Sequence, residues 1–431
     1  MSSSMGPARS VLLVSAVTPG PLDNGKRVVL AGLLDYFVNR LGGAAVHYAL
    51  VGDCQNELPT LPYVVHRLQK PSALKRLGGG ARRLMWDREG TLQEAMLSSS
   101  KLKTDISTLI LQLKPELVVY DTVRLAQHAP AELAQARSVV YLDDLFSVRY
   151  ERILNQTASA RTTEIDPLGE FASNVPSPLR KLVRRPAVHR PLLRFEQRRM
   201  LRRELHLATS FSTCLLVSPE ETRLLRERSG ALGVQTMTPL LPECTKVSRR
   251  IADPSEFVFL GRLNIPHNDD AICSFLAAAV DGLRAACPSA LVRVLGRDPS
   301  PTLLRLASQN SDVVRIEGYV EDLDAVFGRA AALLAPLRFG SGIKIKVLDA
   351  LARGLPVLAT SVAAEGIPMK PDGAGGCIVA NDLRTWPNAL AAMASPLRNA
   401  DLSRSAVHFF TSTYSRSAVM AQYDELFLPG I

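Results

Sequence analysis

Short apolar segments alternate with longer helical segments along most of this 431-residue chain. The first pair is an apolar strand at Val11–Val17 and a helix at Arg27–Leu41, where apolar residues recur every three or four positions. Further strands are predicted at Val46–Val51, Tyr63–Leu68, Glu116–Tyr120, Ser138–Leu142 and Cys214–Ser218. Apolar strands separated by helices predict a parallel sheet that is covered on both faces.

A second series of the same kind follows a proline-punctuated linker at Pro239–Pro254. Its predicted strands are Glu256–Leu260, Leu291–Leu295, Val313–Glu317, Ala331–Ala335 and Pro356–Ala359. We therefore predict an α/β protein with two doubly wound, Rossmann-like domains, over residues 1–245 and 246–405. The polar segment Asn155–Pro178 is predicted to be a loop of the first domain. Because ligands of such sheets bind at the carboxyl ends of the strands, a cleft between the domains is the expected site.

The composition excludes several classes of protein. With 47% hydrophobic and 21% charged residues, the chain is typical of soluble globular proteins. No apolar run approaches the roughly 20 residues of a membrane span, and Val11–Val17 fits a first strand better than a signal peptide. The six cysteines form no C-x-x-C pair, which argues against a zinc site or a disulfide framework and favours a reducing, cytosolic setting. The seven histidines show no metal-ligand spacing.

The net charge of +10 is concentrated in one segment. Residues 180–203 hold ten cations and one acid, Glu196, so the remainder of the chain is nearly neutral. Arg194, Arg198 and Arg202 follow one another at helical spacing, and apolar residues lie between them. A basic amphipathic helix indicates a membrane-surface element, and the alternative is a solvated helix face. Nucleic-acid binding is disfavoured because aromatic residues are not interleaved.

The most informative motif follows the strand that ends at Pro336. Gly340 and Gly342 allow a ligand to approach the backbone closely, and the helix that opens there directs free N–H groups at an anion. Lys344 and Lys346 add positive charge at the same end, and Asp349 falls one turn further, where a carboxylate can accept from ribose hydroxyls. The spacing alone fits a structural glycine turn equally well.

This stretch resembles the donor-binding signature of GT-B glycosyltransferases, particularly the retaining family-4-like enzymes. Asp349-Ala-Leu-Ala-Arg-Gly-Leu-Pro356-Val matches the family helix Glu-Ala-x-Ala-x-Gly-x-Pro-Val, and Gly340-Ser341-Gly342 with the two lysines matches a subgroup. Three further segments, Phe259–Asn264, Gly318–Val320 and Pro19–Arg27, resemble the first donor strand and loop, the turn that lines the nucleobase, and the first acceptor-domain loop.

The sequence departs from the family pattern at three positions. Ser341 and Asp349 stand where the family often has glutamates, and His267 stands where a lysine often follows Arg262 by five residues. Lys344 and Lys346 are expected to supply the missing charge. The stretch Gly20–Lys26 also satisfies G-x-x-x-x-G-K, but Arg27 replaces the Ser/Thr of a P-loop, which disfavours that reading.

Polar residues also follow two strands of the first domain. Asp121, Arg124, Asp143 and Asp144 lie just beyond apolar strands and are predicted to bind acceptor hydroxyls or phosphate, although aspartates here could instead cap helices. Asp322-Leu-Asp324 opens a helix, so capping is expected there, and no metal is predicted.

The resemblance implies a metal-independent GT-B glycosyltransferase, with two domains facing across a cleft and residues 406–431 crossing back to the first domain. It implies a nucleotide-sugar donor as substrate, no cofactor, and retention at the anomeric carbon. The predicted catalytic residues are Arg262, Lys346 and Asp121. The predicted donor-binding residues are Gly25, Arg262, Tyr319, Val320, Gly340, Ser341, Gly342, Lys344, Lys346 and Asp349.

The expected acceptor is a lipid-linked or envelope glycan, handled by a cytoplasmic protein that lies peripherally on the inner face of the membrane. Two alternatives stay open, namely a soluble small-molecule acceptor and a non-catalytic nucleotide-sugar-binding protein. No nucleic-acid partner is expected.

Overall fold

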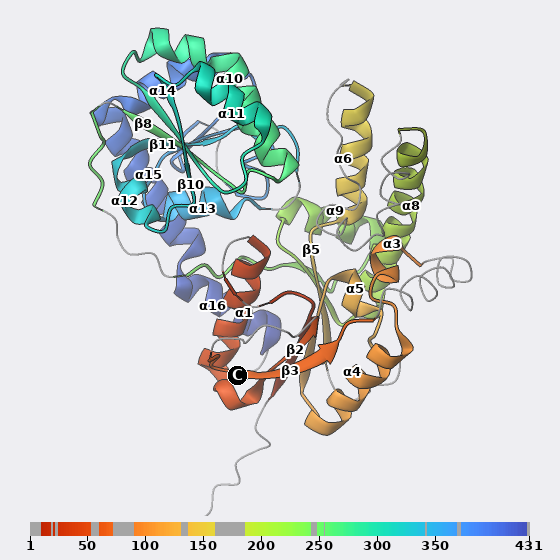
Figure 1. Cartoon of the computed structure of the whole chain (residues 1–431). Helices are drawn as coiled ribbons and strands as arrows, with labels where there is room; N and C mark the ends of the chain where they lie inside the picture. Colours follow the sequence, from red (N-terminus) through yellow and green to blue (C-terminus); the bar gives the residue numbers. More distant parts are fainter. Residues whose placement is uncertain are drawn as a thin grey trace, which may run out of the picture. The chain divides into compact units, whose positions relative to one another are not determined.

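The computed structural model describes residues 10–18, 20–21, 25–52, 60–71, 90–130, 137–159, 186–242, 248–253, 255–340, 343–368 and 372–428. The chain divides into two compact units, here called unit 1 (Met1–Leu240 and Gln422–Ile431) and unit 2 (Leu241–Ala421). The divisions thus fall at Leu240 and Ala421, whereas the sequence analysis placed them after residues 245 and 405. Figure 1 shows the elements of each unit.

Unit 1 is built on a seven-stranded parallel sheet in the order β3-β2-β1-β4-β5-β6-β7. The strands are β1 (Val11–Ser15), β2 (Val46–Gly52), β3 (Val64–Gln69), β4 (Leu117–Asp121), β5 (Arg137–Asp143), β6 (Thr213–Leu216) and β7 (Val234–Thr236). Strands β1 and β4 are buried along their whole length, as continuous apolar runs predict for a central parallel strand.

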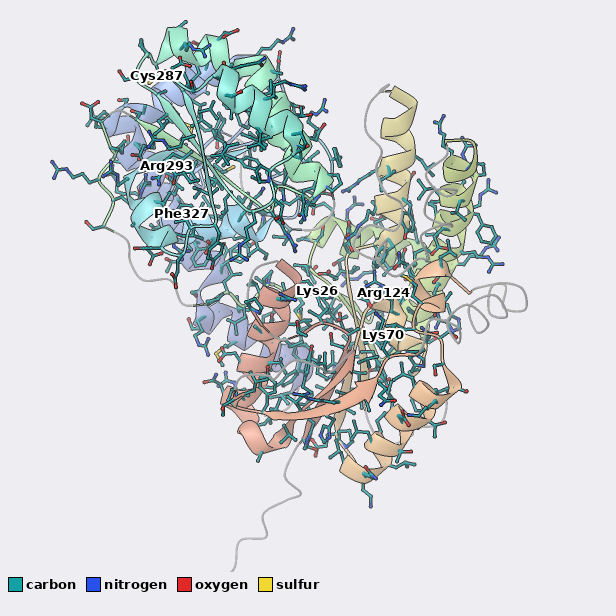
Figure 2. All side chains as sticks on the ribbon, viewed as in Figure 1. Lys26, Lys70, Arg124, Cys287, Arg293 and Phe327 are labelled. Carbon is teal, nitrogen blue, oxygen red and sulfur yellow. The ribbon has the colours of Figure 1, made fainter. Side chains whose placement is uncertain are left out.

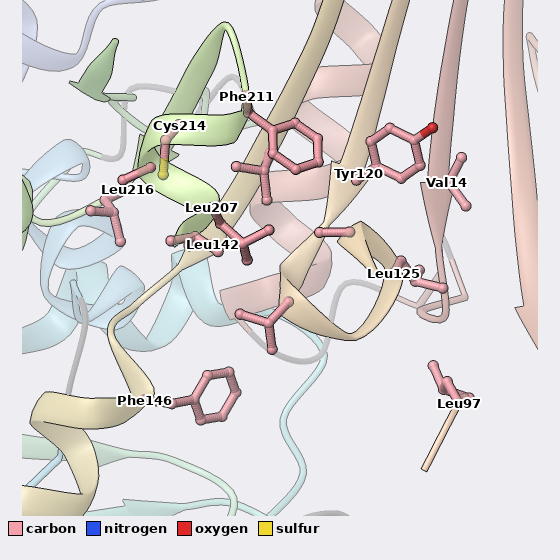
Figure 3. Close-up of a cluster of buried hydrophobic side chains, with 14 of the residues drawn as sticks. Val14, Leu97, Tyr120, Leu125, Leu142, Phe146, Leu207, Phe211, Cys214 and Leu216 are labelled. Carbon is pink, nitrogen blue, oxygen red and sulfur yellow. The ribbon is translucent and has the colours of Figure 1, made fainter. Parts of the chain in front are cut away.

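One face of this sheet carries a large apolar core. Its helices are α4 (Ser100–Leu113), α5 (Thr122–Ala126), α6 (Phe146–Ser159), α8 (Pro186–Ser210) and α9 (Pro219–Ser229). Figure 3 shows part of this core, where Leu142, Phe146, Leu207 and Leu216 come from β5, α6, α8 and β6. Long helices α6 and α8 lie side by side (Figure 1).

The last residues of the chain return to unit 1. Helix α1 (Gly25–Leu41) packs against the end of α16 (Arg416–Phe427), and their aromatic rings meet edge to face, with the Tyr36 and Tyr423 centroids 5.1 Å apart. Tyr36 donates to Asp424 at 3.0 Å, and Arg40 pairs with the same carboxylate. Tyr423 donates to the Thr238 carbonyl at 2.8 Å, so this helix end is tied to the last residues before the division at Leu240.

Unit 2 repeats the doubly wound plan with a six-stranded parallel sheet in the order β10-β9-β8-β11-β12-β13. Its strands are β8 (Glu256–Leu260), β9 (Leu291–Leu295), β10 (Val314–Gly318), β11 (Ala330–Ala335), β12 (Val357–Ala359) and β13 (Cys377–Val379). Its helices are α10 (Pro266–Ala286), α11 (Pro301–Gln309), α12 (Leu323–Arg329), α13 (Ile345–Ala352), α14 (Trp386–Ala394) and α15 (Pro396–Tyr414).

The two Rossmann-like sheets confirm the predicted fold class, and three local expectations were wrong. Strands β7 and β13 were missed, and each is a three-residue strand at the edge of its sheet. The predicted loop Asn155–Pro178 begins too early, since α6 continues to Ser159, and its residues 160–178 lie outside the described residues. No helix in the described part of the chain is both long and apolar enough to cross a bilayer.

Candidate functional site

Three glycines lie side by side at the carboxyl ends of three neighbouring strands of unit 2, β8, β9 and β10. Gly261 follows β8, Gly296 follows β9, and Gly318 ends β10. Gly296 donates to the Gly318 carbonyl at 2.7 Å, and a Cβ atom on Gly296 would lie only 1.9 Å from the Gly261 carbonyl oxygen. Because a side chain on Gly296 would overlap the Gly261 carbonyl, bare backbone forms this part of the edge.

Lys346 reaches this edge from the first turn of α13. Its Nζ donates to the Leu260 carbonyl at 2.9 Å and to Asn268 Oδ1 at 3.0 Å, and lies 4.8 Å from the centroid of the Phe259 ring. Burial lowers the pKa of Lys346 to about 7, and the positive charge of Lys344 adds to the effect. The Lys346 amino group is therefore held at the end of β8, and at neutral pH it is protonated in only part of the molecules.

The glycine-containing loop before α13 is anchored on both sides. Lys344 is buried and occupies the N-cap position of α13, and Gly340 precedes it with a φ of 135°. Arg338 binds Asp270 of α10 through two hydrogen bonds, with Nε to Oδ2 at 2.8 Å. Ser341 and Gly342 lie outside the described residues.

Asp349 belongs to a chain of charges on α12 and α13. Arg353 pairs with Asp349 one turn away, and its Nε donates to Asp324 Oδ1 at 2.5 Å. Burial raises the pKa of Asp349, while Arg353 opposes the shift. Asp322 caps α12 by accepting from the Ala325 N–H at 3.0 Å, as the sequence analysis expected.

The other predicted donor residues lie on the turns after β8 and β10. Arg262 is exposed, and its Nε lies 3.9 Å from Asp298 Oδ2. Tyr319 is also exposed, and the Arg297 guanidinium stacks on its ring with 4.3 Å to the centroid. Val320 beside it is half-buried. The exposed, stacked ring gives this edge a flat surface.

In unit 1, a charged cluster forms where β1, β4 and β5 end. Lys26 Nζ lies 2.5 Å from Asp121 Oδ1 and 3.5 Å from Asp143 Oδ2, and stands over the Tyr141 ring at 4.0 Å. Asp121 Oδ2 accepts from Ser15 Oγ at 2.7 Å, so Asp121 does not cap α5. Thr122 and Asp143 both have positive φ, 65° and 73°. Strained backbone of this kind concentrates at functional sites.

Arg124 and Asp144 belong to a second group of side chains, which surrounds the Phe146 ring. Arg124 Nε donates to Gln93 Oε1 at 2.9 Å, and its guanidinium lies over the Phe146 ring. Burial lowers the pKa of Arg124 to about 10. Asp144 pairs with Arg149, whose guanidinium also lies over Phe146. Figure 2 labels Lys26 in α1 and Arg124 in α5, both within unit 1.

The inward face of α8 differs from its outward face. Arg194, Arg198 and Arg202 are exposed, as predicted. Arg199 donates to the Gly90 carbonyl at 2.7 Å, and Arg203 pairs with Glu94 at 2.8 Å, so these two cations are engaged within the fold. The exposed basic stripe on α8 therefore consists of Arg194, Arg198 and Arg202, and it carries fewer cations than the number of arginines in the helix indicates.

Two buried glutamates face inward from the same helix. Glu196 accepts from the Leu92 N–H at 2.9 Å, at the start of α3 (Leu92–Ala95), and Glu204 accepts from the Ser147 N–H at 3.1 Å in α6. Burial raises their pKa values, to about 7 for Glu196 and about 8 for Glu204. The two carboxyl groups fix α8 to its neighbours.

A separate hollow of about 320 Å³ lies beside α12, where Arg293, labelled in Figure 2, binds both Glu256 and Glu317. None of the predicted donor residues lines it. Among the described residues, no group of three or more His, Cys, Asp or Glu side chains is arranged to hold a metal ion.

The comparisons with known proteins bear on both units. No curated protein sequence matches this chain. Residues 254–396 match the family described as glycosyl transferases group 1. The matched segment makes up most of unit 2.

The solved structures similar to this chain match both units. Sucrose-phosphate synthase from Thermosynechococcus elongatus aligns with a TM-score of 0.66 at 13% identity, over 97% of this chain and 98% of that chain. WaaG, a glycosyltransferase involved in lipopolysaccharide biosynthesis, aligns at 0.57 and 15% identity, over 97% and 100%. HepE from Anabaena in complex with UDP-glucose aligns at 0.60 and 12%, over 96% and 98%. The chain therefore has the GT-B fold.

The structure brings together only part of the predicted site. In unit 2, Lys346 lies at the end of β8, directly before the turn that carries Arg262. In unit 1, Asp121 and Asp143 share one cation, whereas Arg124 and Asp144 belong to the group around Phe146. The sequence analysis missed Lys26 as the centre of that cluster and Arg297 as the partner of Tyr319. Lys26 follows Gly25 in the sequence, but it was considered only as the lysine of a P-loop pattern and not as a partner of the two aspartates.

Proposed function

We propose that this protein transfers a sugar from a nucleotide-sugar to a hydroxyl group of an acceptor, with retention at the anomeric carbon. The observation that carries the proposal is the position of Lys346 in the group 1 segment. Its ammonium is held at the bare glycine edge of the sheet, directly before Arg262 and beside the N-terminus of α13. Helix N-termini and cations together favour the binding of phosphates.

The donor would lie along the carboxyl edge of unit 2. Lys346, Lys344 and Arg262 would stabilise the diphosphate as negative charge develops on the leaving group, which is an electrostatic role. Asp349 would accept from the ribose hydroxyls, and Tyr319 and Val320 would contact the base. The same cations would make a metal ion unnecessary, so EDTA should leave the rate unchanged. HepE, which has the same fold, is complexed with UDP-glucose, and UDP-sugars are therefore the first donors to test.

The acceptor would bind to unit 1, where Asp121 and Asp143 are held at the carboxyl edge of the sheet. We propose a lipid-linked or envelope glycan as the acceptor. The exposed stripe of Arg194, Arg198 and Arg202 supports this proposal, because it would hold the protein on the anionic inner face of the membrane from the cytoplasmic side. Two similar structures, WaaG and the galactosyltransferase WaaB, are described as lipopolysaccharide glycosyltransferases.

A transfer assay tests the proposal. The full chain is incubated with UDP-glucose, UDP-galactose, UDP-N-acetylglucosamine or GDP-mannose and a set of octyl glycosides, and products are detected by mass spectrometry and characterised by proton NMR. We expect one donor to give a glycoside whose anomeric proton coupling matches that of the donor. Lys346→Ala should reduce the rate at least tenfold, whereas Lys101→Ala, an exposed lysine of α4 in unit 1, should not change it. Transfer at an equal rate by Lys346→Ala would overturn the assignment of the donor site.

A further inference from the structure

The charged cluster of unit 1 contains one cation and two carboxylates, and Lys26 joins them. Its ammonium lies 2.5 Å from Asp121 Oδ1 and 3.5 Å from Asp143 Oδ2. We propose that Lys26 and Asp143 together bind one hydroxyl group of an uncharged part of the acceptor, and that this position rejects phosphate. The inference rests on the proposed glycosyl transfer and names the chemistry of its acceptor.

The two sides of the cluster differ in accessibility. Asp121 is buried, with its side chain only 4% exposed, and both of its oxygens have partners in Lys26 and Ser15. The Asp143 side chain is 31% exposed. Its Oδ1 accepts from the Tyr141 hydroxyl at 2.6 Å, which leaves Oδ2 facing Lys26. Asp143 is therefore the side of the cluster that a ligand can reach, and the buried Lys26 Nζ atom lies directly behind it.

The gap itself suits a hydroxyl group. A separation of 3.5 Å between Nζ and Oδ2 is longer than a good hydrogen bond between these groups. A hydroxyl is both donor and acceptor, so one oxygen can accept from the Lys26 ammonium while its hydrogen is donated to Asp143. An ammonium has three donors, and among the described residues the Lys26 Nζ atom forms no hydrogen bond of good geometry, although Asp121 Oδ1 lies 2.5 Å away.

The charge of the cluster disfavours phosphate. A phosphate group brings about −1.5 to −2 charges next to two carboxylates that share one ammonium. The hydrogen bonds of two other cations of unit 1 go to different groups, since Arg124 donates to Gln93 and Arg149 pairs with Asp144. Burial raises the pKa of Asp143 and Lys26 counteracts this, so the lysine also keeps Asp143 able to accept a hydrogen bond.

Ligand-observed NMR on the full chain tests the proposal. The probes are the methyl α-glycosides of glucose, galactose, mannose and N-acetylglucosamine, together with glucose 6-phosphate, each in the presence of UDP. We expect at least one methyl glycoside to bind at least tenfold more tightly than glucose 6-phosphate. Lys26→Met should weaken that glycoside at least tenfold, Lys26→Arg should keep part of the binding, and Lys101→Met should keep all of it.

Asp143→Asn supplies a readout that a purely structural role of the cluster would not change. Removing this charge should shift the ratio of affinities at least tenfold towards glucose 6-phosphate. Because Lys26→Met leaves two carboxylates without their cation, Lys26→Met with Asp121→Asn serves as the charge-balanced variant if the single change unfolds the protein. This double variant should also lose glycoside binding.

Three results would overturn the proposal for Lys26. They are no binding of any methyl glycoside, equal or tighter binding of glucose 6-phosphate by the wild type, or unchanged glycoside binding by a folded Lys26 variant. Thermal stabilisation by UDP, whose proposed site lies in unit 2, separates this from the broader proposal. A wild type that is stabilised by none of UDP, GDP and ADP would overturn the donor assignment instead.

Discussion

Lys346 makes donor binding dependent on pH in a way that can be calculated. Its ammonium is held by the Leu260 carbonyl and Asn268, and its pKa is lowered to about 7. A bound diphosphate would favour the charged form and raise the pKa towards the ordinary value of about 10.4. Binding at pH values above 7 must therefore be accompanied by the uptake of a proton.

The magnitude follows from the fraction of free protein in which Lys346 is protonated. That fraction is about one half at pH 7 and about one hundredth at pH 9, so the dissociation constant for UDP should rise about 50-fold, or about 2.3 kcal/mol. The terminal phosphate of UDP has a second pKa of about 6, so the comparison with Lys346→Met separates its small contribution from that of Lys346.

Isothermal titration calorimetry with UDP in buffers of different ionisation enthalpy measures both the slope and the proton uptake. Lys346→Met should bind more weakly at pH 7 and show no slope, whereas Lys101→Met should behave like the wild type. A wild-type dissociation constant that stays flat from pH 7 to 9, or a slope that survives in Lys346→Met, would refute the reasoning.

The free energy of unfolding of the free protein should rise with pH, whereas its affinity for UDP should fall. The folded pKa of Lys346 lies below its unfolded value, so the unfolded state binds more protons between about pH 7 and 10.4. In this window the Lys346 contribution to the free energy of unfolding rises with pH, by at most about 1.4 kcal/mol per unit. The difference in urea unfolding between the wild type and Lys346→Met measures this contribution of Lys346. A contribution that falls with pH would contradict the lowered pKa of Lys346.

Three further predictions concern packing, the basic helix and a buried acid. Gly376→Ala places a Cβ 2.3 Å from the Ala406 Cβ at a φ of 77°. In urea unfolding it should lower the free energy of unfolding of unit 2 by about 2–4 kcal/mol. The control is Gly318→Ala, which has a positive φ but open space around it and should cost only about 1 kcal/mol. Replacing Arg194, Arg198 and Arg202 by Gln should weaken sedimentation with phosphatidylglycerol vesicles by about 100-fold, at about 1 kcal/mol per arginine, and unchanged sedimentation would favour a soluble acceptor. Burial raises the pKa of Glu204 to about 8, so the folded state holds an extra proton and loses stability as the pH rises from about 4.3 to 8; Glu204→Gln should remove this slope in pH-dependent unfolding, and its persistence would show that another group is responsible.

The sequence predicted the architecture because the apolar strands are buried on both faces. Segments such as Val11–Val17 and Glu116–Tyr120 are continuous apolar runs, and each became a central strand. The edge strand β13 was missed, although β12, which is equally short, was predicted from the apolar residues after Pro356.

The candidate site was only partly predictable. Spacing placed Lys344, Lys346 and Asp349 around one helix start, but it could not show that the Lys346 ammonium turns back beneath the end of β8. That direction depends on the packing of α13 against the sheet. Similarly, Asp121 and Asp143 lie 22 positions apart in the sequence, and only the pairing of β4 with β5 brings them to one lysine.

The most direct test of a nucleotide-sugar donor site in unit 2 is calorimetric titration of the full chain with UDP, GDP and ADP at pH 7. We expect one of these nucleotides to bind the wild type, and Lys346→Ala to reduce its affinity at least tenfold without loss of folded protein. Failure of all three to bind, or equal binding by Lys346→Ala, would contradict it.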